Sequence, residues 1–325
     1  RSTLFPYTTL FRSSYSLNVF DIQNTLPIRG LLAISIILHH FPENLSGTPN
    51  ILYQFKCWGT IIVGLFFFLS GYGLMTSLKY KGNKYLTNFI SHRFMKLLPA
   101  FLIMTFGYML FKIIFQNYSV SFFIKNMVEG WPPLPLSWFI YTMLLYYLLF
   151  YIFARICTRK IMVLSLWLIS TAYCIIIHQI HWGNWWYLSI YAFNVGFTYS
   201  LYEDNIRRVF RYSPNIFLWT TYAIIGLLGF AISKSNGSVF NSVFILAISS
   251  ITPLLIIENV YILGTYKSST LVFLGKISYE IYLVHGTFIE LFSTLNNHWL
   301  VFLISLIISS ITCAWILRNI CKRIV

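Results

Sequence analysis

The sequence predicts an all-α integral membrane protein with about ten transmembrane helices and both termini in the cytoplasm. Its 325 residues are 58% hydrophobic and only 10% charged, with a mean hydropathy of +0.71, whereas charged residues approach about a quarter of a soluble domain. Apolar runs of about 17 to 22 residues, the length that crosses about 30 Å of hydrocarbon, recur along the chain. The basic residues gather in alternate connections between these runs, as in multi-pass membrane proteins.

The apolar segments follow one another along most of the chain. We expect membrane-spanning helices at approximately residues 26–41, 58–78, 97–116, 136–154, 161–178, 185–202, 215–233, 239–258, 271–292 and 299–317. Residues 14–325 are therefore expected to form one transmembrane domain. Residues 1–13 (RSTLFPYTTLFRS) resemble translated sequencing-adapter sequence, so we interpret them as a non-native segment and exclude them from the fold prediction.

The loop charges predict the orientation, because Lys and Arg are retained on the cytoplasmic side. One side receives the N-terminus and every second connection, and it carries all 23 basic residues except Lys56, Lys112, Lys125 and Lys234. This distribution favours an even number of spans with both termini cytoplasmic. The net charge of +15 is then mostly a topology signal, and too few residues lie outside the membrane to build a nucleic-acid-binding surface.

The sequence shows no motif for a metal or a bound cofactor. No Gly-rich phosphate loop, Ser-His-Asp order or metal-binding helix motif is present. The cysteines are scattered without a CxxC pair, which indicates packing rather than metal ligation. They are Cys57, Cys157, Cys174, Cys313 and Cys321. We therefore expect no metal and no bound cofactor.

Arg29 and His40 lie in the first apolar segment, IRGLLAISIILHHF. Their separation of eleven residues carries a helix roughly 16 Å along its axis and returns it to within roughly 20° of the starting face. His39 is rotated about 100° away from that face. Ionisable groups inside a membrane helix are costly and usually face a polar cavity, so this stripe indicates a site that extends across much of the bilayer.

Two further segments combine polar and apolar residues. GLFFFLSGYG at residues 64–73 places Ser70 and Tyr72 after an aromatic run, where small residues allow a neighbouring helix or a ligand to approach. HRFMKLLP at residues 92–99 contains Arg93 and Lys96 on the cytoplasmic side. These two residues are either snorkelling groups at the membrane interface or a clamp for an anionic cytosolic ligand such as phosphate.

The ninth span contains LGKISYEIYLVH at residues 274–285. On a single helix, one face would carry Gly275, Ser278, Tyr282 and His285. Lys276 and Glu280 would form an i, i+4 ion pair on another face. For His285, a structural role and a functional role are both open.

Tryptophans gather at the predicted outer side. They are Trp131, Trp138, Trp182, Trp185, Trp186 and Trp299. An interfacial aromatic belt is the favoured interpretation, and stacking against a sugar is the alternative.

These segments, taken together and in this order, resemble acyltransferase family 3 from about residue 20 to the C-terminus. The matching motifs are Arg29-x10-His40 followed by Phe41, FFFLSGY at 66–72, Arg93-x2-Lys96-x2-Pro99, Ser137-Trp138-Phe139 and LGKISYEIYLVH at 274–285. The resemblance implies a polytopic enzyme that moves an acyl group, commonly acetyl, from cytosolic acyl-CoA to a hydroxyl of a surface glycan or lipid-linked sugar. It also implies that His40 is the essential histidine, with Arg29 as its partner and Arg93 and Lys96 in the basic turn.

Two positions depart from the family pattern. His92 and Lys96 stand where arginines are frequent, so a point charge replaces a planar two-donor fork. The fourth span lacks the acidic pair that many members carry after the tryptophan, which leaves a carboxylate helper for His40 unassigned.

The chemistry of these residues fits acyl transfer. His40 can take a proton from an attacking hydroxyl as general base. Arg29 can bind donor phosphate or stabilise an oxyanion. Ser70 or Tyr72 could hold an acyl group, but no base is demonstrably adjacent, so no covalent step is predicted. Frequent Ile, Asn, Lys and Tyr indicate an AT-rich bacterial genome, and we expect a location in the bacterial cytoplasmic membrane.

The alternative function is a transporter or flippase for a glycolipid or acidic sugar. Arg29 and His40 would then form a proton-coupled or anion-binding pair. A transporter of this kind should show paired broken helices in two repeated halves, and the Gly and Pro positions show no such pairing. A non-enzymatic sensor or assembly partner has no positive feature.

Overall fold

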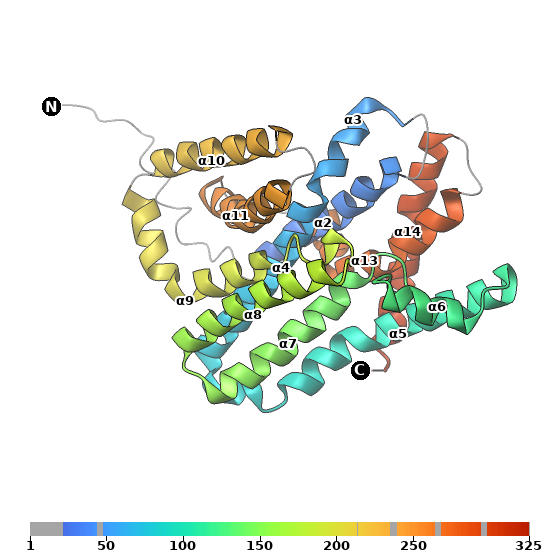
Figure 1. Ribbon diagram of the computed structural model, residues 1–325, viewed down its shortest axis with the longest axis horizontal. Coiled ribbons are helices and arrows are strands. Elements are labelled where there is room, and N and C mark those ends of the chain that lie inside the picture. Colours follow the sequence, from blue (N-terminus) through green and yellow to red (C-terminus); the bar gives the residue numbers. More distant parts are fainter. Residues whose placement is uncertain are drawn as a thin grey trace.

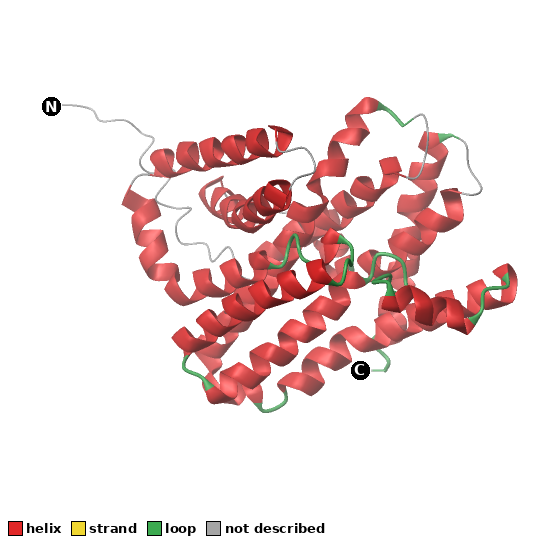
Figure 2. Ribbon diagram, viewed as in Figure 1, coloured by secondary structure: helices red, strands yellow, loops and turns green. Residues whose placement is uncertain are grey.

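The computed structural model describes residues 22–43, 48–212, 214–234, 239–263, 268–293 and 298–324. These residues are helical throughout, joined by short turns, and none of them forms a strand (Figure 2). The all-α prediction is therefore confirmed. Residues 1–13, which we interpret as adapter-derived, lie outside the described part of the chain.

The helices fold into a single bundle in which distant parts of the chain lie side by side (Figure 1). The longer helices are α2 (Ile22–His40), α4 (Gly59–Lys81), α5 (Phe89–Gln116), α7 (Trp138–Ile156), α8 (Arg159–Gln179), α9 (Tyr191–Tyr212), α10 (Pro214–Lys234), α11 (Val239–Leu263), α13 (Ser278–Ser293) and α14 (Trp299–Cys321). The shorter ones are α3 (Asn50–Tyr53), α6 (Val120–Val128), α12 (Ser269–Lys276) and the 3-10 turns η1 (Phe41–Glu43), η2 (Gln54–Trp58), η3 (Gly82–Leu86) and η4 (Asn184–Trp186).

Each of the ten expected apolar segments coincides with helical structure. Within the described residues, six segments are long and apolar enough to cross a membrane. They are Asn50–Leu86, Phe89–Gln116, Trp138–Ile156, Arg159–Gln179, Asn241–Asn259 and Trp299–Cys321. The protein is thus a multi-pass membrane protein by composition and helix length, while the count of ten spans and the cytoplasmic termini stay predictions.

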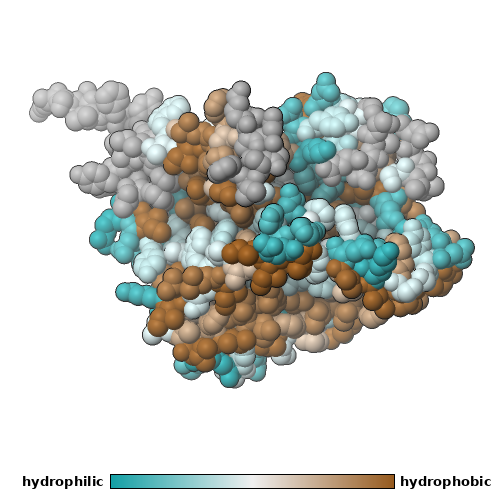
Figure 3. Space-filling model, viewed as in Figure 1, coloured by the Kyte–Doolittle hydropathy of each residue, from teal (hydrophilic) through white to brown (hydrophobic). Residues whose placement is uncertain are grey.

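The outer faces of the spanning helices are apolar, as lipid contact requires. A broad hydrophobic surface covers the lower part of the view, where α5, α7 and α8 lie (Figure 3). Leu148 on α7 and Leu164 and Leu168 on α8 are 44%, 60% and 62% exposed, respectively. Soluble proteins rarely expose an apolar patch of this size on neighbouring helices, so this surface faces lipid.

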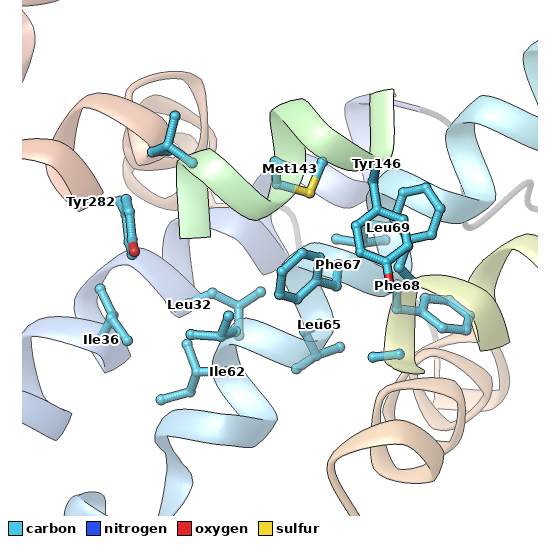
Figure 4. Close-up of a cluster of buried hydrophobic side chains, with 14 of the residues drawn as sticks. Leu32, Ile36, Ile62, Leu65, Phe67, Phe68, Leu69, Met143, Tyr146 and Tyr282 are labelled. Atoms are coloured by element: carbon cyan, nitrogen blue, oxygen red, sulfur yellow. The ribbon is translucent and has the colours of Figure 1, made fainter. Parts of the chain in front are cut away.

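The interior is filled by aromatic and branched side chains from α2, α4, α7 and α13. Figure 4 shows Leu32 and Ile36 of α2 on the same side as Ile62 of α4, and Phe67 of α4 near Met143 of α7. Phe67 is fully buried and meets the ring of Phe139 at 4.6 Å between centroids. Close packing of such large side chains fixes the helices that carry the polar residues relative to one another.

Glycines allow α4 to approach its neighbours closely. A Cβ atom added at Gly71 would overlap the carbonyl oxygen of Phe193 on α9, and one at Gly196 of α9 would overlap the carbonyl oxygen of Phe68. At Gly64 the near neighbour is the backbone of Ser249 on α11. Gly64 and Gly71 of the 64–73 segment therefore serve helix packing, one of the two roles that the sequence left open.

A second close contact joins α2 to α12. A Cβ atom at Gly30 would overlap the carbonyl oxygen of Leu271, and one at Gly275 would overlap that of Leu26. This reciprocal contact fixes the start of α2 against the short helix that precedes α13. It therefore sets how the polar residues of α2 and α13 face each other.

The expected ninth span is interrupted at its centre. Helix α12 ends at Lys276, Ile277 forms a turn, and α13 begins at Ser278. The predicted single helix face from Gly275 to His285 is therefore wrong. The predicted Lys276–Glu280 pair is also wrong, because the turn rotates α12 relative to α13 and Glu280 pairs with Arg318 of α14 instead, at 3.2 Å.

We expect Gly275→Ala to destabilise the fold, because its methyl group would meet the backbone of Leu26 rather than a movable side chain. The expected loss is about 1–3 kcal/mol of unfolding free energy. Gly107→Ala on α5 is the matched control, since nothing lies within 4 Å of its added Cβ and alanine favours a helix by about 0.5–1 kcal/mol. The thermal midpoint in detergent measures both, and equal midpoints would contradict the α2–α12 contact.

Candidate functional site

Helix α2 carries Arg29 in its first half and His40 at its last residue. The helix is continuous between them, so they lie roughly 16 Å apart along its axis. Ala33 and Ile36, on the same stripe, are 0% and 2% exposed, so this face of α2 points into the bundle. The two polar residues are thus held at opposite ends of one buried stripe.

His40 lies against a second histidine, His285 of α13. The ring centroids are 5.6 Å apart and the planes make an angle of 34°. His285 is fully buried, and its Nδ1 lies 2.6 Å from the carbonyl oxygen of Tyr282. The structure therefore brings His285, whose role the sequence left open, directly beside His40.

His39 packs in a different direction from His40. Its Nδ1 lies 3.1 Å from the carbonyl oxygen of Phe55, and a Cβ atom at Gly59 would overlap its ring. The two neighbouring imidazoles remain in contact at 4.4 Å between centroids. His39 thus ties the end of α2 to the turn before α4, while His40 faces α13.

Two other predicted residues of α13 serve the local structure around His285. The hydroxyl of Ser278 donates to the carbonyl oxygen of Gly275 at 3.0 Å, which stabilises the turn between α12 and α13. The hydroxyl of Tyr282 donates to the carbonyl oxygen of Leu136, which lies in the loop before α7. Tyr282 is thus anchored through its hydroxyl, and its own carbonyl oxygen accepts the hydrogen bond from His285.

At the other end of the stripe, Arg93 of α5 is surrounded by aromatic rings. Its Nη2 donates to the hydroxyl of Tyr85 at 2.5 Å. Its guanidinium lies 5.4 Å from the ring centroid of Tyr147 and 5.7 Å from that of Phe89. Aromatic faces attract a guanidinium, so these three residues orient Arg93 without neutralising its charge.

Arg29 and Lys96 belong to the same group of cations. Arg29 interacts electrostatically with Tyr147 and Arg93, and Lys96 is close enough to be affected by the charges of Arg93, Arg29 and Arg318. In the described part of the chain, Arg29 has neither a hydrogen-bond acceptor nor a carboxylate partner. Glu280 pairs with Arg318 at 3.2 Å, and its negative charge also acts on Lys96.

We call Arg29, Arg93, Lys96 and Arg318 the cationic cluster. Arg29, Arg93 and Arg318 are half-buried and Lys96 is exposed. With Glu280 as their described counter-charge, these four side chains leave an excess of positive charge in a membrane protein. Such an excess is costly unless an anion binds. The cluster therefore fits a polyanionic ligand, and its guanidinium groups suit the oxygens of a phosphate.

Ser70 and Tyr72 of α4 face different surroundings. Ser70 lies beside the Tyr147 hydroxyl, next to the cationic cluster. The Tyr72 hydroxyl donates to Oε2 of Glu203 on α9 at 2.8 Å, and Glu203 in turn pairs with Arg207 at 3.1 Å. Ser70 therefore lies next to the cationic cluster, whereas the Tyr72 hydroxyl is hydrogen-bonded to α9.

Four of the six tryptophans that were predicted to lie on the outer side form two close pairs. Trp131 and Trp185 lie 4.9 Å apart, and Trp182 and Trp186 lie 5.0 Å apart, between ring centroids. A cavity of about 200 Å³ lies beside Trp131, Trp182 and Trp186, and none of the predicted site residues lines it. The indoles of Trp182 and Trp186 donate to the carbonyl oxygens of Val128 and Gly130, so those groups are already used in packing.

Three residues of the site were missed from the sequence. Arg318 follows an apolar span and had been counted as a topology signal alone. Tyr85 and Tyr147 stand among many tyrosines, and no spacing singles them out. Among the described residues, no group of three His, Cys, Asp or Glu side chains is placed to hold a metal ion.

The family model described as an acyltransferase domain matches residues 28–319, nearly the whole chain. No curated protein and no solved structure matches.

Proposed function

Since the chain belongs to acyltransferase family 3 and is a multi-pass membrane acyltransferase, we propose that it transfers an acetyl group from cytosolic acetyl-CoA. The acceptor is a hydroxyl of an exopolysaccharide, cell-wall or lipid-linked sugar. The protein acts as an O-acetyltransferase in the bacterial cytoplasmic membrane. The acceptor sugar is presented at the outer face.

One observation carries this proposal. Arg29 of the cationic cluster and His40, which lies against His285, occupy one stripe of α2 and are roughly 16 Å apart along the helix axis. This arrangement suits an elongated donor with phosphates at one end and a reactive thioester at the other. A small anion alone would occupy the cluster without reaching His40.

Different residues bind the donor and carry out the chemistry. Arg29, Arg93 and Lys96 bind the phosphates of acyl-CoA, with Arg93 oriented by Tyr85 and Tyr147. His40 takes the proton of the acceptor hydroxyl as its oxygen attacks the thioester carbonyl carbon. The carbon–sulfur bond then breaks, and the thiolate of coenzyme A takes up the proton. No acyl-enzyme intermediate is required.

The proposal is tested by acyl transfer in membranes that contain the protein. Radiolabelled acetyl-CoA is supplied on the cytosolic side, and label is measured in the polysaccharide and in the lipid-linked sugars. We expect protein-dependent label in one of these fractions. If no short acyl-CoA gives label in either fraction, acyl transfer to a sugar is rejected, and uptake or flipping of labelled glycolipid becomes the assay of the transporter alternative.

A further inference from the structure

His285 contains one ring nitrogen whose role is fixed and one whose role is open. The ring is fully buried, and Nδ1 lies 2.6 Å from the carbonyl oxygen of Tyr282. A carbonyl oxygen only accepts hydrogen bonds, so Nδ1 carries the hydrogen. In a neutral imidazole this leaves Nε2 with a lone pair, as an acceptor.

That acceptor has no hydrogen-bond partner among the described residues. Buried polar atoms almost always have a partner, and an exception calls for a physical reason such as a catalytic role. The aromatic rings in contact with His285 are those of Tyr282, whose hydroxyl is used on Leu136, and His40. His40 is therefore the neighbour that can supply an N–H.

The distance between the rings permits such a bond. Imidazole nitrogens lie on the ring perimeter, so a centroid separation of 5.6 Å brings nitrogens on facing edges close to the hydrogen-bonding range of roughly 2.7–3.2 Å. A rotation of the His40 ring would complete the hydrogen bond to Nε2 of His285. Hydrogen bonds at catalytic sites commonly tighten in this way when substrate binds.

We infer that His285 is the positioning residue for His40, an inference that rests on the proposed function of His40 as base. Nε2 of His285 accepts the N–H of His40, which holds the His40 ring in one orientation and tautomer. The other nitrogen of His40 is then the base for the acceptor hydroxyl. The neutral imidazole of His285 thus orients His40, the function for which the sequence showed no carboxylate.

The proton inventory of the transfer stays balanced. The acceptor hydroxyl gives its proton to His40 as the ester oxygen–carbon bond forms. His40 is then a cation with both nitrogens protonated, and Nε2 of His285 stabilises one of its N–H groups. When the thioester carbon–sulfur bond breaks, the proton passes from His40 to the thiolate, while His285 keeps its own hydrogen on Nδ1 throughout.

A pair of isosteric amides tests this role. In His285→Gln the amide oxygen can occupy the place of Nε2, whereas in His285→Asn the shorter side chain reaches only the place of Nδ1. We expect the Gln variant to retain kcat within about 10-fold and the Asn variant to lose about 100-fold or more. The KM for acetyl-CoA should stay unchanged in both, because the proposed phosphate site is beside Arg29, roughly 16 Å along α2 from His40.

Equal kcat values for the two variants, at equal amounts of folded protein, would overturn the inference. A second measurement needs neither variant and no activity. In ¹⁵N-histidine-labelled protein, replacement of His40 with Ala should shift the Nε2 resonance of His285, and an unchanged resonance would also overturn it. Because this readout is independent of turnover, failure of the His40–His285 contact is distinguishable from failure of the proposed acetyl transfer.

Discussion

Replacement of His40 with Ala is expected to reduce acetyl transfer by about 100-fold to 10,000-fold, the usual contribution of a positioned general base. The side chain is half-buried at the end of α2 and packs beside His285. Its removal takes away the group that accepts the hydroxyl proton but leaves the cationic cluster intact. We therefore expect kcat to fall while the KM for acetyl-CoA stays near the wild-type value.

Two other histidines provide the controls for this measurement. His178→Ala removes an exposed imidazole at the far end of α8 and should leave transfer unchanged. His39→Ala removes the hydrogen bond to Phe55 and the packing on Gly59, so we expect a lower thermal midpoint and a smaller loss of kcat than at His40. Wild-type turnover in folded His40→Ala would rule out His40 as the base.

The sequence predicted the fold class because composition and the length of apolar runs are local properties. The all-α architecture follows directly from them, and each expected segment coincides with helical structure. The interruption at Ile277 was missed. No proline marks it, and glycines such as Gly275 are common in continuous membrane helices. Next to the interruption, Gly275 packs against the backbone of Leu26 of α2, a contact that no pattern within α12 and α13 contains.

The candidate site was predictable where its residues share one helix. Arg29 and His40 follow from the helical repeat of α2. Arg93 and Lys96 follow from a basic segment that was predicted to be a turn, and this prediction was wrong because the segment lies within α5. The contact of His40 with His285 and the approach of Arg318 to Glu280 join helices that are distant in sequence. Such contacts depend on tertiary packing, so the sequence left the role of His285 open and placed Glu280 with the wrong partner.

Replacement of Arg93 with Ala is expected to raise the KM for acetyl-CoA by about 10-fold to 100-fold, because a hydrogen bond to a charged group contributes roughly 1.5–3 kcal/mol. Arg93 is oriented by Tyr85 and by the rings of Phe89 and Tyr147, so its fork is ready for a phosphate. Arg93→Lys should restore only part of the affinity, since an ammonium lacks the planar two-donor fork.

A donor without phosphates separates binding of the nucleotide from the chemistry. Acetyl-pantetheine keeps the thioester but lacks the phosphates, so wild type and Arg93→Ala should use it equally well. Lys84→Ala removes an exposed charge in the turn before α5 and is the matched control, with an unchanged KM expected. If Arg93→Ala lowered turnover of both donors alike, Arg93 would act on the reacting group or on the fold. If Arg93→Ala changed the kinetic constants for neither donor, the cationic cluster would not be the site of the phosphates. The donor would then have to reach His40 along another path.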